Sequence, residues 1–169
     1  MTAETPPLRP QLRPITLADA PVLAKLEAAI FAVDAWTVEE LTTFLQMHTV
    51  SGMLLLTPQG QPVGYALVRQ VADEAEVLTI GVHPDQRGQG WGKILLETEL
   101  ARLIATGVAQ VFLEVRASNK AAQALYHACG GKAIGWRRQY YPAAAGQPAE
   151  DARVYLFQLP PFVEGAPSP

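Results

Sequence analysis

The order of apolar and polar residues along the chain predicts alternating short strands and amphipathic helices. Apolar residues recur at helical spacing from Leu17 to Phe31, which predicts a first helix started near Thr16. Thr37 with Glu40 three residues later forms a capping box for a second helix up to Met47. Short apolar or alternating runs bounded by glycine, proline or polar residues predict strands at residues 11–15, 53–56, 63–71, 77–82, 111–115, 132–140 and 153–159.

The central segment reads as strand, glycine loop and helix. The apolar strand at residues 77–82 ends before Pro84, and residues 87–93 then read R-G-Q-G-W-G-K. Apolar residues follow at helical spacing until Gly107, a typical helix stop. Glycines before a helix let several backbone N–H groups converge where the helix dipole is positive, because no Cβ blocks the approach. The segment therefore predicts a site for a phosphate or pyrophosphate.

Three phosphate-binding designs can be compared with this loop. A P-loop requires a hydroxyl residue after its lysine, but Ile94 follows Lys93. A dinucleotide fingerprint requires G-x-G-x-x-G in a tight turn, whereas Gly88, Gly90 and Gly92 are spaced G-x-G-x-G after a longer connection. The third design, [Q/R]-x-x-G-x-[G/A], fits residues 87–92 at each fixed position and resembles the pyrophosphate loop of the GNAT superfamily of acetyltransferases, which bind acetyl-CoA. On the loop alone, a glycine-rich turn before an ordinary helix remains the alternative.

The downstream sequence narrows this resemblance. Residues 112–126 read F-L-E-V-R-A-S-N-K-A-A-Q-A-L-Y, and residues 137–142 read R-R-Q-Y-Y-P. These motifs are similar to the RimI-type branch, the ribosomal-protein N-terminal alanine acetyltransferases, over residues 63–159, with a looser match before them. The resemblance implies an α/β chain of α+β type with the GNAT fold. In that fold about four helices flank a mixed, mostly antiparallel sheet, and two central strands splay apart to admit the pantetheine arm of acetyl-CoA.

By resemblance, the donor-binding residues are backbone contacts on the central strand, the glycine loop and one helix-capping asparagine. They are Ile80, Gly81, Val82, Arg87, Gly88, Gln89, Gly90, Trp91, Gly92, Lys93 and Asn119. Trp91 replaces a smaller aliphatic residue, and either covers the cofactor or packs under the loop. Gly131 stands where the family usually has phenylalanine, which predicts local repacking.

The same resemblance assigns the chemistry to Glu114 and Tyr126. An α-amino group with a pKa of roughly 8 is largely protonated at neutral pH, so a general base is needed, and Glu114 is that base. Tyr126, two helical turns after Asn119, is the acid that protonates the departing thiolate. Without the family, Glu114 reads as a strand residue that faces solvent or pairs with Arg116, and Tyr126 as an aromatic core residue.

Residues that bind the acceptor are expected among the aromatic side chains. Tyr140 and Tyr141 match the family's Y-Y-P motif, and Trp36 is a candidate for the acceptor groove, although a hydrophobic staple explains it equally well. Arg137 and Arg138 either form a solvated strand face or hold an acidic group of the substrate.

Composition limits the remaining possibilities. The 169 residues fit one domain at residues 11–160, with a flexible leader at 1–10 and a disordered tail at 161–169. A net charge of −3 favours neither nucleic acid nor an anionic membrane, and one cysteine excludes an internal disulfide. The three histidines show no ligand spacing, so no metal is expected. Without a signal peptide or spanning segment, we expect a cytoplasmic protein, either a monomer or a weak dimer.

Three functions remain in consideration. The first is acetyl transfer from acetyl-CoA to a protein N-terminus, the alanine-headed N-terminus of a small-subunit ribosomal protein being the RimI-type target. The second keeps the fold and acetylates a small amine, such as a polyamine, amino acid or aminoglycoside. The third is a non-catalytic acyl-CoA-binding module, which would need neither Glu114 nor Tyr126. The tyrosine pair before Pro142 favours an extended peptide end over a small polycation.

Overall fold

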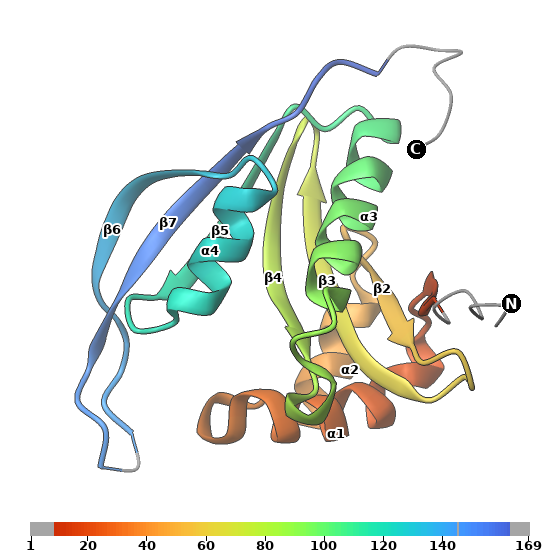
Figure 1. The fold of residues 1–169 in the computed structure, drawn as a ribbon, viewed down its shortest axis with the longest axis horizontal. Helices are drawn as coiled ribbons and strands as arrows, with labels where there is room; N and C mark the ends of the chain where they lie inside the picture. Colours follow the sequence, from red (N-terminus) through yellow and green to blue (C-terminus); the bar gives the residue numbers. More distant parts are fainter. Residues whose placement is uncertain (1–8, 145, 163–169) are drawn as a thin grey trace, which may run out of the picture.

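A seven-stranded sheet forms the centre of the molecule. The computed structural model describes residues 9–144 and 146–162. The strands lie in the order β1-β2-β3-β4-β5-β7-β6, and only the pair β4–β5 is parallel (Figure 1). Their bounds are β1 Gln11–Pro14, β2 Val50–Leu56, β3 Pro62–Val71, β4 Glu74–Val82, β5 Gln110–Arg116, β6 Lys132–Tyr141 and β7 Glu150–Gln158. The mixed, mostly antiparallel sheet expected from the resemblance is confirmed.

Four α-helices cover the two faces of this sheet. They are α1 Ala20–Phe31, α2 Val38–Gln46, α3 Trp91–Ala105 and α4 Lys120–Ala128, with short 3-10 turns η1 Leu17–Asp19, η2 Ala32–Asp34 and η3 Pro84–Gln86. The helices α1 and α2 pack on a core that includes Leu54 and Tyr65, while α3 packs on their sheet neighbours Leu55 and Ala66. This alternation follows from the two-residue period of a strand, which sends neighbouring side chains to opposite faces. The capping box between Thr37 and Glu40 is present as predicted.

The parallel pair β4–β5 separates soon after it begins. Its register contains only the pairs Glu74 with Gln110, Ala75 with Val111 and Glu76 with Phe112. On its other side β4 stays paired with β3 up to Val82, with one bulge at Leu67/Val68. Figure 1 shows β4 and β5 diverging, with α4 on the β5 side of the opening. The splayed central strands are therefore confirmed.

The edge strand β6 contains a wide bulge just before the predicted tyrosine pair. Arg137 pairs with Ala152 and Tyr141 with Glu150, so three residues of β6 lie opposite the single residue Asp151. Inside the bulge Gln139 has φ 48°, and its backbone N–H donates to the Asp151 carboxylate at 2.8 Å. This hydrogen bond fixes the bulge and therefore the direction in which the following tyrosines point.

Close packing at the end of α4 explains Gly131. A Cβ built on Gly131 would lie 2.7 Å from Cζ of Phe157 and 2.9 Å from the carbonyl oxygen of Tyr126. The ring of Phe157, which comes from β7, thus closes off the space beside this position. Phe157 therefore fills the space that a side chain at position 131 would need.

We expect Gly131→Ala to lower the free energy of unfolding by about 1–3 kcal/mol, because the added methyl group overpacks a buried site. Urea denaturation followed by circular dichroism measures the change. Gly135→Ala is the matched control, since a Cβ there meets nothing within 4 Å. Equal stability of the two variants would contradict the packing argument.

Two predictions from the sequence concern the ends of the chain. The predicted leader and tail fall mostly on residues 1–8 and 163–169, which lie outside the described residues. In the part of the chain that the structure describes, no helix has both the length and the apolar character needed to cross a membrane.

Candidate active site

The glycine loop leads directly into α3, which begins earlier than the sequence predicts. Gly90 caps the helix in the left-handed region with φ 77°, and Trp91 is the first helical residue. Gly88 also has a left-handed φ, of 78°, so glycine is required at both positions. The first turn of a helix has backbone N–H groups without intrahelical partners, and these face outward as an anion site.

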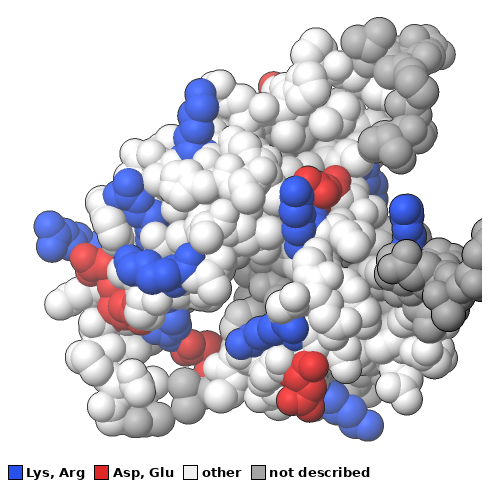
Figure 2. Space-filling model, viewed as in Figure 1, with Lys and Arg blue, Asp and Glu red and all other residues white. Residues whose placement is uncertain are grey.

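A cavity of about 620 Å³ lies at this loop, between α3 and α4. Ten of the eleven predicted donor-binding residues line it: Ile80, Gly81, Val82, Arg87, Gly88, Gly90, Trp91, Gly92, Lys93 and Asn119. Gln89 does not; its amide donates to the side chain of Gln86 at 3.0 Å. Figure 2 shows a hollow on this face, with lysine and arginine side chains beside it. We call this space the donor cavity.

The walls of the donor cavity suit an extended ligand that ends in phosphate groups. Trp91 is buried against Leu95 and packs under the loop while it also lines the cavity. The Nε of Arg87 donates to the carbonyl oxygen of Val82 at 3.0 Å, which anchors the loop to the end of β4. Among the described residues, no strand pairs with the far half of β4 on the side that faces β5, so the backbone groups on that side can pair with the amides of a ligand.

A second cavity of about 430 Å³ joins the donor cavity at its inner end. Tyr126, Ile80 and Asn119 belong to both. Glu114 and all three aromatic residues predicted to bind the acceptor, Trp36, Tyr140 and Tyr141, line the second cavity. We call it the acceptor cavity. The structure therefore brings both predicted catalytic residues and the three predicted acceptor residues to one place.

Glu114 lies on β5 with only 9% of its side chain exposed. Its partner is neither solvent nor Arg116, because Oε1 lies 3.1 Å from Nε of Arg137 on β6. Burial raises the pKa of Glu114, Arg137 opposes this effect, and the nearby charge of Glu76 adds to the increase. A carboxylate with a raised pKa is a stronger base, which suits removal of a proton from an ammonium group.

Tyr126 lies on α4 with 5% of its surface exposed. Its ring packs edge-on against Tyr155 at a centroid distance of 5.5 Å. Burial raises the pKa of Tyr126 above its ordinary value, so the phenol keeps its proton at neutral pH and can donate it. Burial likewise raises the pKa of Tyr141 to about 12.

Glu27 is a polar residue of the acceptor cavity that the sequence analysis missed. It is 2% exposed on α1, and its carboxylate accepts hydrogen bonds from the hydroxyl of Tyr65, from Thr79 at 3.0 Å and from the backbone N–H of Trp36 at 3.0 Å. These contacts join α1, the sheet and the segment before α2. The sequence signal that could have identified Glu27 is its position on the apolar face of an amphipathic helix, directly after Leu26.

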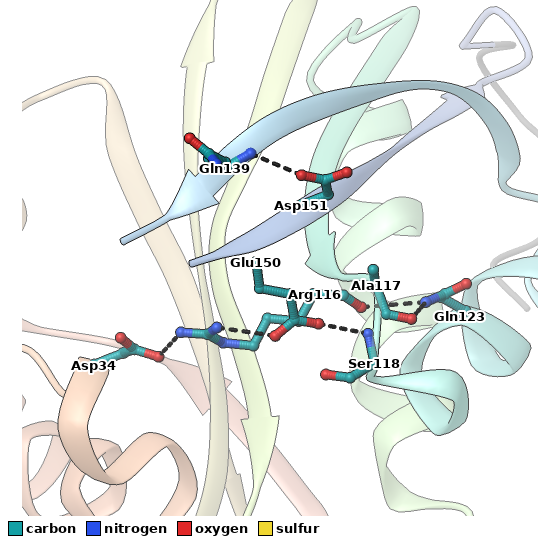
Figure 3. Close-up of polar contacts among 8 residues, drawn as sticks. All are labelled: Asp34, Arg116, Ala117, Ser118, Gln123, Gln139, Glu150 and Asp151. Carbon is teal, nitrogen blue, oxygen red and sulfur yellow. Dashed lines mark hydrogen bonds and ion pairs between the residues drawn. The ribbon is translucent and has the colours of Figure 1, made fainter. Parts of the chain in front are cut away.

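Arg116 links three segments around the site (Figure 3). Its guanidinium pairs with Asp34 of η2 and, at 3.1 Å, with Glu150 of β7, and it stacks on the ring of Tyr141 at 4.1 Å. Glu150 also accepts the backbone N–H of Ser118 at 2.6 Å, and hydrogen bonds from Ser118, that of its side chain above all, lower the pKa of Glu150. Asp34 and Arg116 border both cavities, so this ion pair crosses the opening between β4 and β5.

We expect Arg116→Gln to lower the free energy of unfolding by about 1–2 kcal/mol, the sum of two partly exposed ion pairs and one cation–π contact. Urea denaturation at low and high salt measures this loss. Arg153→Gln is the control, because Arg153 stacks on Trp136 at 4.4 Å outside both cavities. At high salt the free energies of unfolding of Arg116→Gln and the unmodified protein should differ less, because salt screens the ion pairs. A difference that does not depend on salt would argue against a contribution from the ion pairs.

Comparison with known proteins identifies the family of this chain. The Acetyltransferase (GNAT) family model matches residues 21–130. The N-alpha-acetyltransferase RimI of Mycobacterium tuberculosis (strain H37Rv) is 40% identical over 149 residues, which cover 83% of this chain and 89% of that protein. The [ribosomal protein bS18]-alanine N-acetyltransferase of Escherichia coli (strain K12) is 45% identical over 104 residues, 62% of this chain and 69% of the relative.

A solved structure resembles the whole domain. The crystal structure of the ribosomal-protein-S18-alanine N-acetyltransferase from Escherichia coli superposes with a TM-score of 0.83 at 31% identity, covering 95% of this chain and all of that one. The family transfers acetyl groups from acetyl-CoA, and the donor cavity has the glycine loop, helix N-terminus and free strand edge that this molecule requires. The chain therefore belongs to the GNAT family and is an N-acetyltransferase of RimI type.

Proposed function

We propose that the protein moves the acetyl group of acetyl-CoA to the N-terminal α-amino group of a protein, the N-terminal alanine of a small-subunit ribosomal protein. The observation that supports this most is the junction of the two cavities. Tyr126 borders both of them, and Glu114 lies in the acceptor cavity beyond it. The name of the Escherichia coli relative supports a ribosomal protein that begins with alanine as the acceptor, and the name of the Mycobacterium tuberculosis relative supports an α-amino group.

In the proposed reaction Glu114 first takes a proton from the α-ammonium group, through a water molecule. The free amine then attacks the thioester carbonyl carbon, so that a C–N bond forms and the C–S bond breaks. Tyr126 gives its proton to the departing thiolate and is reprotonated from solvent. The nitrogen loses its second proton to solvent, which leaves the amide and free CoA thiol. Positioning of both reactants in one site supplies much of the rate.

The two roles fit the environments of the two residues. The carboxylate of Glu114 has a raised pKa, which brings its basicity closer to that of the amine. The phenol of Tyr126 borders the donor cavity, where the thiolate forms, and its raised pKa keeps it protonated. Trp36, Tyr140 and Tyr141 provide flat apolar walls for the first residues of a peptide.

Thiol release from acetyl-CoA, followed in parallel with two acceptors, tests this function. One acceptor is a short peptide that begins Ala-Arg with a free N-terminus, and the other is a mixture of spermidine and free amino acids. We expect turnover with the peptide and none when its α-amino group is blocked. Turnover with the small amines alone would replace the protein acceptor with a small-molecule one and leave the family assignment unchanged.

A further inference from the structure

We propose that Arg137 is a positioning residue for the transfer reaction: its guanidinium holds the Glu114 carboxylate in place and keeps it ionised within a groove that removes it from water. This inference rests on the proposed function, because it gives Arg137 a role only if Glu114 is the base. The sequence left this arginine as either a solvated residue or a substrate contact.

The geometry around Glu114 supports this role. The carboxylate lies between the acceptor cavity and a further cavity of about 390 Å³, which Arg137, Arg69, Glu74 and Glu76 also line. The Nε of Arg137 is 3.1 Å from Oε1, and 56% of the arginine side chain is exposed while 9% of the glutamate is. The cation is thus reached by water and the anion is shielded from it. An ion pair of this kind stabilises the charged form of its shielded member.

Strand pairing places Arg137 at the edge of the β6 bulge. Arg137 is the last residue paired with β7 before the bulge, and the Asp151 carboxylate holds the backbone of Gln139 at 2.8 Å. The ring of Tyr140 lies 5.4 Å from the guanidinium carbon on the side of the acceptor cavity. The guanidinium is therefore placed by backbone structure and by an aromatic neighbour in addition to its ion pair.

Other ionisable groups line the same two cavities as Glu114. They are Glu74 and Glu76 on β4, Arg69 on β3 paired with Glu76, Arg116 on β5 paired with Asp34 of η2, Glu27 on α1, Tyr126 on α4, and Tyr140 and Tyr141 on β6. Burial raises the pKa of Glu114, the charge of Glu76 raises it too, and Arg137 is the cation that lowers it. Loss of Arg137 therefore shifts the pKa of Glu114 further upward.

The first test is the pH dependence of kcat/KM with the Ala-Arg peptide. The peptide amine titrates near pKa 8, so Glu114 produces a second, more acidic break in the profile. We expect Arg137→Gln to move this break to higher pH by about 1 unit, which lowers kcat/KM about tenfold at a fixed pH below it. Arg137→Lys should return the break most of the way to its original pH, because lysine keeps the positive charge. Arg138→Gln is the matched control, since that side chain is 90% exposed and lies 3.9 Å from Asp151 instead.

The second test is independent of activity. Carbon-13 NMR of the side-chain carboxyl groups, with the Glu114 signal assigned through Glu114→Gln, reports the ionisation of this residue directly. An upward shift of its titration in Arg137→Gln, absent in Arg138→Gln, is expected. An unchanged titration in Arg137→Gln, combined with a large activity loss in Glu114→Gln, would overturn this inference alone. Full activity of Glu114→Gln would overturn the proposed mechanism and, with it, the role of Arg137.

Discussion

Glu114→Gln is expected to lower kcat with the Ala-Arg peptide by about 10²–10⁴-fold, the usual contribution of a general base. Glutamine keeps the size of the side chain but has no basic carboxylate, so the ammonium group of the acceptor keeps its proton. The affinity for acetyl-CoA should not change, because Glu114 does not line the donor cavity. Thiol-release kinetics and calorimetric titration with acetyl-CoA measure the two quantities separately.

Asp73→Asn is the control for Glu114→Gln. Asp73 lies exposed in the turn between β3 and β4, so this change removes one negative charge far from both cavities and should keep normal kinetics. At a pH well above 8 the amine is already deprotonated, and Glu114→Gln should then regain a normal rate. Such a recovery would show that the loss at neutral pH comes from impaired proton removal. A normal rate at neutral pH would show that another group is the base.

The second large effect is expected from Tyr126→Phe. This variant removes one hydroxyl group, and we expect kcat to fall by about 10²-fold or more, because the thiolate then leaves without a proton donor. The packing against Tyr155 at 5.5 Å is retained, so the unfolding temperature should change little. An acyl donor with a more acidic thiol should recover part of the lost rate, since such a leaving group needs no proton.

Tyr155→Phe is the matched control, because it removes the same group from the ring that packs on Tyr126. Tyr155 borders neither cavity, so its loss of a hydroxyl should not change kcat. If both variants lose the same activity, the effect comes from altered packing between α4 and β7, and Tyr126 is not the acid.

Local pattern was enough to predict most of the fold. The seven strands were predicted near their observed bounds, because each element has its own hydrophobic period and its own caps. Two of them, β2 and β4, begin at Val50 and Glu74, ahead of the predicted starts at residues 53 and 77. The start of α3 was placed late. Gly92 and Lys93 looked like loop residues, and only the burial of Trp91 beneath the loop shows that the helix begins there.

The site was predicted by motif, but its internal contacts were not. The sequence analysis considered Arg116 as the partner of Glu114, because it lies two residues away and only residues close along the chain can be paired from sequence alone. In a strand, residues i and i+2 share a face, but here Arg116 turns to Asp34 and Glu150. The actual partner, Arg137, reaches Glu114 from another strand, and that approach depends on the register between strands, which no local pattern predicts.

The brief contact between β4 and β5 also affects how the free energy of folding is distributed. Among the described residues, β4 and β5 share three register pairs across this seam, while β3–β4 and β5–β7 are paired along most of their lengths. Acetyl-CoA in the seam would supply amide partners that these two strands do not offer each other, much as an added strand would. Bound acetyl-CoA would then strengthen the connection between the two halves of the sheet and raise the free energy of unfolding of the whole domain.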